Sequence, residues 1–228
     1  MKIFAIADTH LSGNPPYKPM SIFGDHWENH WEKIKTDWQT NVSEEDTVLL
    51  AGDISWAMKL EDALVDLNEI VALPGKKIII KGNHDYWWQT IGKMTTAVNG
   101  QLTFLQNSFM GIDTYAVCGS RGWICPEDPY FGESDQSIYA REVSRVKTSL
   151  KAARDAGYCR LILMLHYPPQ YADLPSGFTQ LMEEYHVELC VFGHLHDEAI
   201  KIAPTQGNGT VYHLVSADSL NFKLKQLI

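Results

Sequence analysis

Residues 76–85 read KKIIIKGNHD. The first six form a short run centred on isoleucines, which is typical of a β-strand that is buried on both faces. A glycine, an amide, an imidazole and a carboxylate follow at once, and side chains of the last three kinds bind metals or transfer protons. The same order, an apolar strand and then such side chains, recurs along the chain. It predicts both a fold class and the place of a functional site.

Short apolar runs alternate with helical patterns over most of the chain. The predicted strands are residues 2–7, 47–51, 76–81, 114–119, 161–165, 188–192 and 210–215, and the predicted helices are residues 59–73, 137–156 and 176–185. Short polar turns separate further predicted strands, at residues 103–105 and 198–202, from their neighbours. The alternation indicates a layered α/β fold, and the short turns favour mixed rather than purely parallel sheets.

The chain of 228 residues is predicted to form a single domain, 1–228, because its length suits one hydrophobic core and no linker or repeat divides it. Residues 12–42 stand out as a helical insertion in which Trp27, Trp31 and Trp38 recur at helical spacing. Two interpretations of this segment are open. Its helix packs onto the domain through the tryptophans, which we favour, or it forms a lid that contacts the substrate.

The composition excludes several classes of protein. Hydrophobic residues make up 45% and charged residues 21%, and no apolar run has the length of a membrane-spanning helix, which indicates a soluble globular protein. The formal net charge of −9 argues against a surface that attracts nucleic acid in general. The N-terminal apolar stretch is too short for a signal peptide, and the cysteines show no C-x-x-C spacing. We therefore expect a cytoplasmic protein with reduced thiols.

Polar side chains of the same few kinds follow five of the predicted strands. They are Asp8 and His10, Asp53 after Gly52, the run Gly82-Asn83-His84-Asp85, His166, and His194 and His196 after Gly193. Open α/β sheets bind ligands beyond the C-terminal ends of their strands, so we expect these side chains to gather at one site. Each motif alone has a structural explanation, such as a turn or a helix cap, but their joint occurrence favours a functional site.

The kinds of side chain narrow the choice of metal. Carboxylates, an amide and imidazoles, without a thiolate, suit a pair of divalent ions such as Mn, Fe or Zn and argue against a structural zinc site of the cysteine type. A carboxylate shared by two ions would hold them ~3.5–4 Å apart, as in two-metal hydrolytic sites.

In this order, the motifs resemble the signature of the calcineurin-like metallophosphoesterases, and they span residues 8–196. The resemblance implies a four-layer αββα sandwich of two mixed β-sheets flanked by helices. It also implies two divalent metal ions, of which we favour Mn over Fe or Zn. One ion would be held by Asp8, His10, Asp53 and His196, and the other by Asp53, Asn83, His166 and His194.

The resemblance further implies the reaction. The protein would be a metal-dependent phosphohydrolase, either a phosphodiesterase or a phosphomonoesterase, in which a hydroxide held by both metals attacks the phosphorus of a small-molecule or nucleotide-like phosphoester. His84 would protonate the leaving group, and Asp85 would accept a hydrogen bond from the other ring nitrogen of His84. A catalytically silent scaffold of the same fold, made for protein interactions, is the alternative. The complete set of ligand positions favours the enzyme.

The chain departs from the pattern of many relatives after two of its motifs. Gly52-Asp53 continues as Ile54-Ser55-Trp56, without a further acidic residue or an arginine. Asp85 is followed by Tyr86-Trp87-Trp88, without the arginine often found in relatives that act on phosphoserine in proteins. We therefore expect a small phosphoester substrate rather than a phosphoprotein. The lack of a basic cluster also argues against a nucleic-acid partner.

Three residues are candidates for substrate binding, each with a structural alternative. Arg121, between closely placed glycines, either binds a phosphoryl oxygen or pairs with a local carboxylate such as Glu127. Tyr86 and Trp87, together with Trp88, either line a pocket and stack on a base or an aromatic leaving group, or belong to the core.

Overall fold

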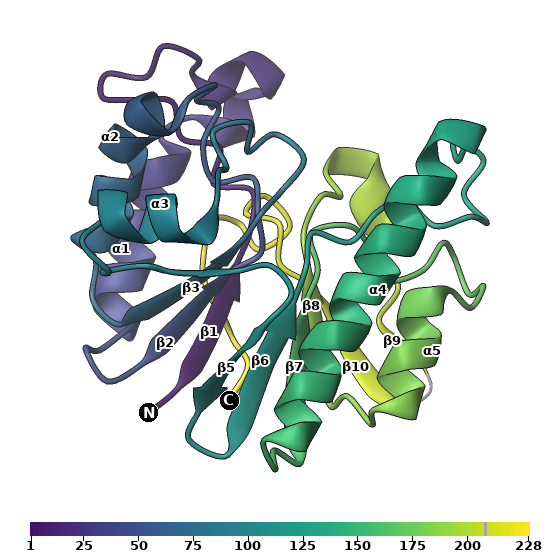
Figure 1. The fold of residues 1–228 in the computed structure, drawn as a ribbon. Helices are drawn as coiled ribbons and strands as arrows, with labels where there is room; N and C mark the ends of the chain where they lie inside the picture. Colours follow the sequence, from purple (N-terminus) through teal and green to yellow (C-terminus); the bar gives the residue numbers. More distant parts are fainter. Residues whose placement is uncertain (208) are drawn as a thin grey trace. The chain divides into compact units, whose positions relative to one another are not determined.

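The computed structural model describes residues 1–207 and 209–228, and these divide into two compact units. Unit 1 comprises Met1–Phe104 and Val215–Ile228, and unit 2 comprises Leu105–Leu214. Each unit is built around its own β-sheet with helices beside it (Figure 1). Unit 1 is thus assembled from two separate stretches of sequence, whereas unit 2 is one stretch.

The sheet of unit 1 has the strand order β11-β1-β2-β3-β4. Its strands are β1 (Ile3–Ile6), β2 (Thr47–Leu50), β3 (Lys76–Ile80), β4 (Thr103–Leu105) and β11 (Lys225–Gln226). The register of the parallel strands β1, β2 and β3 pairs Ile6 with Leu50 and Leu50 with Ile79, and β11 is antiparallel to β1. Every residue of β1 and β2 is buried, as their apolar sequences predict for a sheet covered on both faces. The loops that follow the three parallel strands therefore leave the sheet at the same edge.

The tryptophans of residues 12–42 pack into the core of unit 1. This segment forms 3-10 turns at Met20–Phe23 and Asp25–Trp27 and the helix α1 (His30–Asn41). Trp27 and Trp38 are buried in one hydrophobic cluster, and Nε1 of Trp38 donates a hydrogen bond to the carbonyl oxygen of Pro74 at 2.9 Å. These contacts are the ones expected if the segment packs onto the domain through its tryptophans. Trp27 precedes the helix, however, because α1 begins at His30. Unit 1 also contains α2 (Leu60–Val71) and α3 (Ile91–Ala97).

The sheet of unit 2 has the strand order β5-β6-β7-β8-β10-β9. Its strands are β5 (Phe109–Ile112), β6 (Tyr115–Gly119), β7 (Arg160–Met164), β8 (Leu189–Phe192), β9 (Gln206–Gly207) and β10 (Thr210–Leu214), and its helices are α4 (Glu133–Asp155) and α5 (Gly177–Glu184). Strands β6, β7, β8 and β10 are parallel, whereas β5 and β9 are antiparallel to their neighbours. No helix in the described ranges is both long and apolar enough to cross a membrane.

Two mixed sheets with flanking helices confirm the fold class predicted from the sequence. One predicted strand is wrong, because residues 198–202 lie in the 3-10 helix Asp197–Ile202. The segment mixes apolar and charged residues as a half-exposed strand does. However, Glu198 and Lys201 form an ion pair across three positions, a spacing that places them side by side on a 3-10 helix. Helix α3 and strand β5 were not predicted, and α4 begins at Glu133 rather than at residue 137.

The four cysteines lie in or beside apolar stretches of the sequence, which predicts core thiols, and this prediction is confirmed for three of them and wrong for Cys159. Cys118, Cys125 and Cys190 are buried and free, whereas Cys159 is exposed. Burial raises the pKa of Cys118 and Cys125 to about 12. These two thiols therefore stay protonated near neutral pH and do not act as nucleophiles.

We expect Trp38→Ala to lower the free energy of unfolding by about 3–5 kcal/mol, because it empties a fully buried site and removes the hydrogen bond to Pro74. Gln39→Ala, at the neighbouring exposed position of α1, is the control and should change this free energy by less than ~0.5 kcal/mol. Denaturant titration followed by circular dichroism measures both. Equal stabilities of the two variants would contradict the packing of α1 on the core of unit 1.

Candidate functional site

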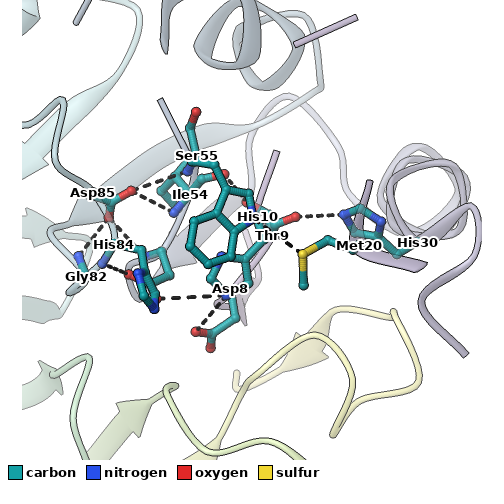
Figure 2. A network of polar contacts seen from close by, with 12 residues as sticks. Asp8, Thr9, His10, Met20, His30, Ile54, Ser55, Gly82, His84 and Asp85 are labelled. Carbon is teal, nitrogen blue, oxygen red and sulfur yellow. Dashed lines mark hydrogen bonds and ion pairs between the residues drawn. The ribbon is translucent and has the colours of Figure 1, made fainter. Parts of the chain in front are cut away.

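The loops after β1 and β2 are joined by backbone hydrogen bonds. The N–H of Asp8 donates to the carbonyl oxygen of Gly52 at 2.9 Å. The N–H of His10 donates to the carbonyl oxygen of Asp53 at 3.0 Å. These bonds continue the parallel pairing of the two strands past their ends. The side chains that the loops carry are therefore held close together, and Asp8 and His10 lie side by side in Figure 2.

Four candidate ligands have a left-handed backbone conformation, which residues other than glycine rarely adopt. They are Asp8, His10 and Asp53 in unit 1 and His194 in unit 2, with φ angles of 59°, 46°, 53° and 72°. Each such residue costs about 1–2 kcal/mol, so the surrounding contacts must hold it in place. Strain of this kind clusters at functional sites, where it directs side chains to positions that a relaxed backbone would not give them.

Asp8, His10 and Asp53 bring two carboxylates and an imidazole together in the interior of unit 1. Nε2 of His10 lies 3.9 Å from Oδ1 of Asp8 and 3.8 Å from Oδ2 of Asp53, and the two aspartates have oxygens within 4.8 Å of each other. The exposed fractions of the three residues are 0%, 4% and 2%. Two carboxylates buried this close repel each other, and a divalent cation would remove the repulsion. The donor set fits Mn, Fe or Zn.

The carboxylate of Asp85 joins the loop after β2 to the loop after β3. Its donors are the backbone N–H groups of Asp53, Ile54, Ser55 and Gly82, at 2.7–3.3 Å, and Nε1 of Trp87, at 3.0 Å. Figure 2 shows Asp85 facing Gly82 on one side and Ile54 and Ser55 on the other. Hydrogen bonds to an ionised carboxylate are among the strong ones, so Asp85 anchors both loops. Its bond to the ring of His84 stays a prediction.

Gly82 leaves the space that the Asp53 carboxylate occupies. A Cβ atom at residue 82 would lie 2.0 Å from Oδ1 of Asp53 and 2.2 Å from the backbone nitrogen of Asp53. The same Oδ1 accepts the backbone N–H of His84 at 2.7 Å. Glycine is therefore needed here because two loops approach closely.

Trp56 contacts two imidazoles of the candidate site. Its ring stacks on His10 with centroids 4.6 Å apart, and its centroid lies 4.5 Å from that of His84. Nζ of Lys18 lies 3.0 Å from the centroid of the Trp56 ring. From the sequence alone, Trp56 is notable only as a departure from the pattern of relatives. The contacts of Trp56 with His10 and His84 join three separate loops, and residue spacing in the sequence does not reveal contacts of this kind.

The segment 12–42 is connected to the site through His30 and Gly13. Nε2 of His30 donates to the carbonyl oxygen of Thr9 at 2.8 Å, and burial lowers the pKa of His30, which favours the neutral ring (Figure 2). The carboxylate of Asp66 accepts the N–H of Gly13 at 2.7 Å and the hydroxyl of Ser55 at 2.5 Å. The segment is therefore bonded to the backbone directly before His10 and, through Asp66, to the side chain of Ser55 in the loop after β2.

The other candidates in unit 1 lie in or just after the loop that follows β3. Asn83 and His84 are half-buried, and Tyr86 is 56% exposed. Trp87 is 1% exposed and belongs to the hydrophobic core, against which Trp88 packs. Trp87 is therefore a core residue, because its buried side chain offers no surface to a substrate.

In unit 2, His166 and His194 follow the adjacent parallel strands β7 and β8. The N–H of Gly193 donates to the carbonyl oxygen of His166 at 3.1 Å, and the two imidazole centroids are 5.2 Å apart. His166 is fully buried, whereas His194 and His196 are half-buried. Unit 2 thus brings two predicted ligands together, and His196 lies directly before the helix Asp197–Ile202.

Arg121 contacts the loop that carries His166. Its carbonyl oxygen accepts the N–H groups of His166 and Tyr167, at 2.9 and 3.2 Å. Its guanidinium lies 4.3 Å from the ring centroid of Trp123 and 3.8 Å from Oε1 of the buried Glu142. Burial lowers the pKa of Arg121, but a guanidinium stays charged. Arg121 thus pairs with a carboxylate, but this carboxylate is Glu142 of α4 and not Glu127. A contact between Arg121 and a phosphoryl oxygen stays a prediction.

A family model described as "Calcineurin-like phosphoesterase" matches residues 1–198. Among solved structures, the protein TT1561 of Thermus thermophilus resembles the chain with a TM-score of 0.59 and 15% identity, over 98% of this chain and 96% of that one. The protein of unknown function AQ665 from Aquifex aeolicus has a TM-score of 0.52 and 15% identity, over 99% and 95%. At this identity the likeness shows the fold alone. A search of curated protein sequences gave no match.

We expect Gly82→Ala to weaken Mn binding by about 10- to 100-fold, because the added methyl group displaces the carboxylate of Asp53. Gly92→Ala is the matched control, since a Cβ atom there meets nothing within 4 Å. Calorimetric titration of metal-stripped protein with Mn measures both affinities. Equal Mn affinities of the two variants would count against Asp53 as a ligand.

Asp85→Asn should lower the free energy of unfolding by about 1–3 kcal/mol, because an amide has one acceptor oxygen and would turn its NH2 group toward a backbone N–H. Asp113→Asn, in an exposed turn with φ of 52°, is the control, because asparagine tolerates this conformation. Denaturant titration compares the two. A stability of Asp85→Asn equal to that of the control would refute the anchoring role of Asp85.

Proposed function

Because the chain belongs to the calcineurin-like phosphoesterase family, we propose that it is a metal-dependent phosphohydrolase acting on a small-molecule or nucleotide-like phosphoester. The observation that carries this proposal is the convergence of the Asp8 and Asp53 carboxylates on the imidazole of His10. Members of this family depend on two metal ions. A buried cluster with an excess of carboxylates is a place where divalent cations bind.

The residues proposed to hold the metals follow the order of the family's motifs. Asp8, His10, Asp53 and His196 would hold one ion, and Asp53, Asn83, His166 and His194 the other. Carboxylates and imidazoles without thiolates are compatible with Mn, which we favour, and with Fe and Zn. Bound metals would lower the pKa of the attacking water molecule and stabilise charge on the phosphoryl oxygens.

His84 is proposed as the acid that protonates the leaving group. Its backbone N–H is bonded to Asp53 at 2.7 Å, and its ring lies against Trp56, so both its loop and its ring are held. An imidazole takes up and releases protons near neutral pH, which suits this task. Trp56 also stacks on His10 and so keeps the proposed acid in a constant relation to a proposed ligand.

The proposed role of Asp85 is to position His84. Its hydrogen bonds to the loops after β2 and β3 support this role, and a bond to the second ring nitrogen of His84 would fix the tautomer. Arg121 and the exposed Tyr86 are proposed as contacts of the phosphoester. For Arg121, the phosphate would compete with Glu142.

Hydrolysis of p-nitrophenyl phosphate and of bis(p-nitrophenyl) phosphate by metal-stripped protein, with and without added Mn, tests the proposal. Turnover restored by Mn supports it, and the ester that reacts decides between phosphomonoesterase and phosphodiesterase. Absence of turnover of both esters with metals bound would favour the catalytically silent scaffold.

In the same assay, we expect His84→Ala to lower kcat by about 10²- to 10⁴-fold, the usual contribution of a general acid, with unchanged metal content. His186→Asn is the control, because this exposed residue carries no motif and asparagine tolerates its φ of 48°. Elemental analysis of the purified variants measures the metal. Loss of metal together with activity would mean that His84 is a ligand and not an acid.

A further inference from the structure

A pocket of about 200 Å³ lies beside His194 in unit 2. Residues from the loops after β6, β7 and β8 line it, and these loops leave the C-terminal ends of parallel strands, where such sheets bind ligands. The lining includes Ile124, Tyr130, Tyr167, Tyr171, His194 and Ile202. The pocket thus shares one residue, His194, with the proposed metal ligands.

The lining suits an uncharged, flat group. Tyrosine rings and aliphatic side chains make up much of it, and no lysine or arginine is among the lining residues in the described part of the chain. Asp128 contributes a carboxylate. A phosphoryl group would therefore meet a negative charge without a cation beside it. An aromatic ring would instead bury apolar surface against the tyrosines.

The inner wall of the pocket is formed in advance. The ring of Tyr167 packs against three aromatic side chains, with its centroid 4.2 Å from that of His194, 5.0 Å from that of Trp123 and 5.6 Å from that of His166. The N–H of Tyr167 donates to the carbonyl oxygen of Arg121 at 3.2 Å. A ligand ring in this pocket would meet a surface that is already ordered and that lies directly beside a proposed metal ligand.

The rim of the pocket exposes large apolar side chains. Tyr130 is 88% exposed and Ile202 is 66% exposed. The turn that presents Tyr130 is held by Asp128, whose Oδ1 accepts the N–H of Tyr130 at 2.8 Å and whose carbonyl oxygen accepts the N–H of Phe131 at 2.9 Å. Apolar side chains kept exposed at the mouth of a pocket lose water only when a ligand covers them, and such patches mark binding sites.

We infer that this pocket binds an uncharged aromatic ring of the substrate, so that the substrate class is aryl phosphoesters or nucleotides. The inference rests on the proposed function, because His194 is a proposed metal ligand at the reacting centre. It places ring recognition in unit 2, at Tyr130 and Tyr167, rather than at Tyr86 and Trp87 in unit 1.

Binding of the ring without a phosphate tests the pocket independently of turnover. Ligand-observed NMR of the metal-loaded protein with adenosine, 4-nitrobenzyl alcohol and ribose, all of which are uncharged, should show saturable binding of at least one ring compound and none of ribose. Binding of adenosine alone identifies a nucleobase, and binding of 4-nitrobenzyl alcohol alone identifies an aryl group. Tyr130→Ala and Ile202→Ser should each raise the Kd by about two- to tenfold, the effect of losing one ring contact. Met110→Ala, at an exposed position of β5, is the control and should leave the Kd unchanged.

Kinetics with and without a ring then connect the pocket to turnover. Tyr130→Ala should lower the ratio of kcat/KM for p-nitrophenyl phosphate to kcat/KM for glycerol 2-phosphate by about two- to tenfold. For a strict diesterase, bis(p-nitrophenyl) phosphate and a dialkyl diester replace this pair. The exposure of Tyr130 and Ile202 allows the substitutions without loss of the fold, which circular dichroism verifies.

The outcomes separate the pocket from the proposed function. No saturable binding of either ring compound, or equal Kd values for the unmodified protein and both pocket variants, overturns the inference. Loss of ring preference in Tyr86→Ala but not in Tyr130→Ala overturns it as well. If the ring binds as expected but no phosphoester is hydrolysed, the pocket stands and the proposed function fails. If a phosphoester is hydrolysed but the ratio of the two kcat/KM values is unaffected by Tyr130→Ala, the proposed function stands and the inference about the pocket fails.

Discussion

The carboxylate of Asp85 holds two loops of the candidate site in one position. A buried carboxylate is tolerated only when its oxygens accept hydrogen bonds, and backbone N–H groups of the loops after β2 and β3 supply them here. Folding can bury this charge only when both loops have reached their final positions. The backbone around Asp53 is therefore fixed by a residue outside the proposed ligand set, and the geometry of the ligands depends on that residue.

The sheet of unit 1 provides the second constraint. Hydrogen bonds between the loops after β1 and β2 hold Asp8, His10 and Asp53 in left-handed conformations, and Gly82 admits the carboxylate of Asp53 at a distance that any side chain would prevent. None of these arrangements is favourable for the local segment alone. They persist because the buried strands beneath them contribute apolar packing that outweighs the strain.

The positions of the candidate ligands could be predicted because each follows an apolar run, and such a run is a local signal. For Asp8, Asp53 and His166, the structure has the strand and the loop where the sequence predicts them. Contacts between distant segments carry no such signal. The stacking of Trp56 on His10 joins two loops, and Arg121 pairs with Glu142 of α4 rather than within its own loop. Residues 198–202 were wrongly predicted for a local reason. A segment of only five residues has a sequence pattern that is compatible with a strand and with a 3-10 helix.

Unit 1 is closed by residues that come after unit 2 in the sequence. Strand β11 pairs with β1, and Ala7 exchanges backbone hydrogen bonds with Val215 and Ala217. During synthesis, the sheet of unit 2 can form before β11 has left the ribosome, and until then the edge of β1 that pairs with β11 has no partner strand. An open strand edge is a place where chains pair with the wrong partner. The edge of β1 therefore stays open throughout the synthesis of unit 2, and the nascent protein is exposed to this kind of aggregation until β11 pairs with β1.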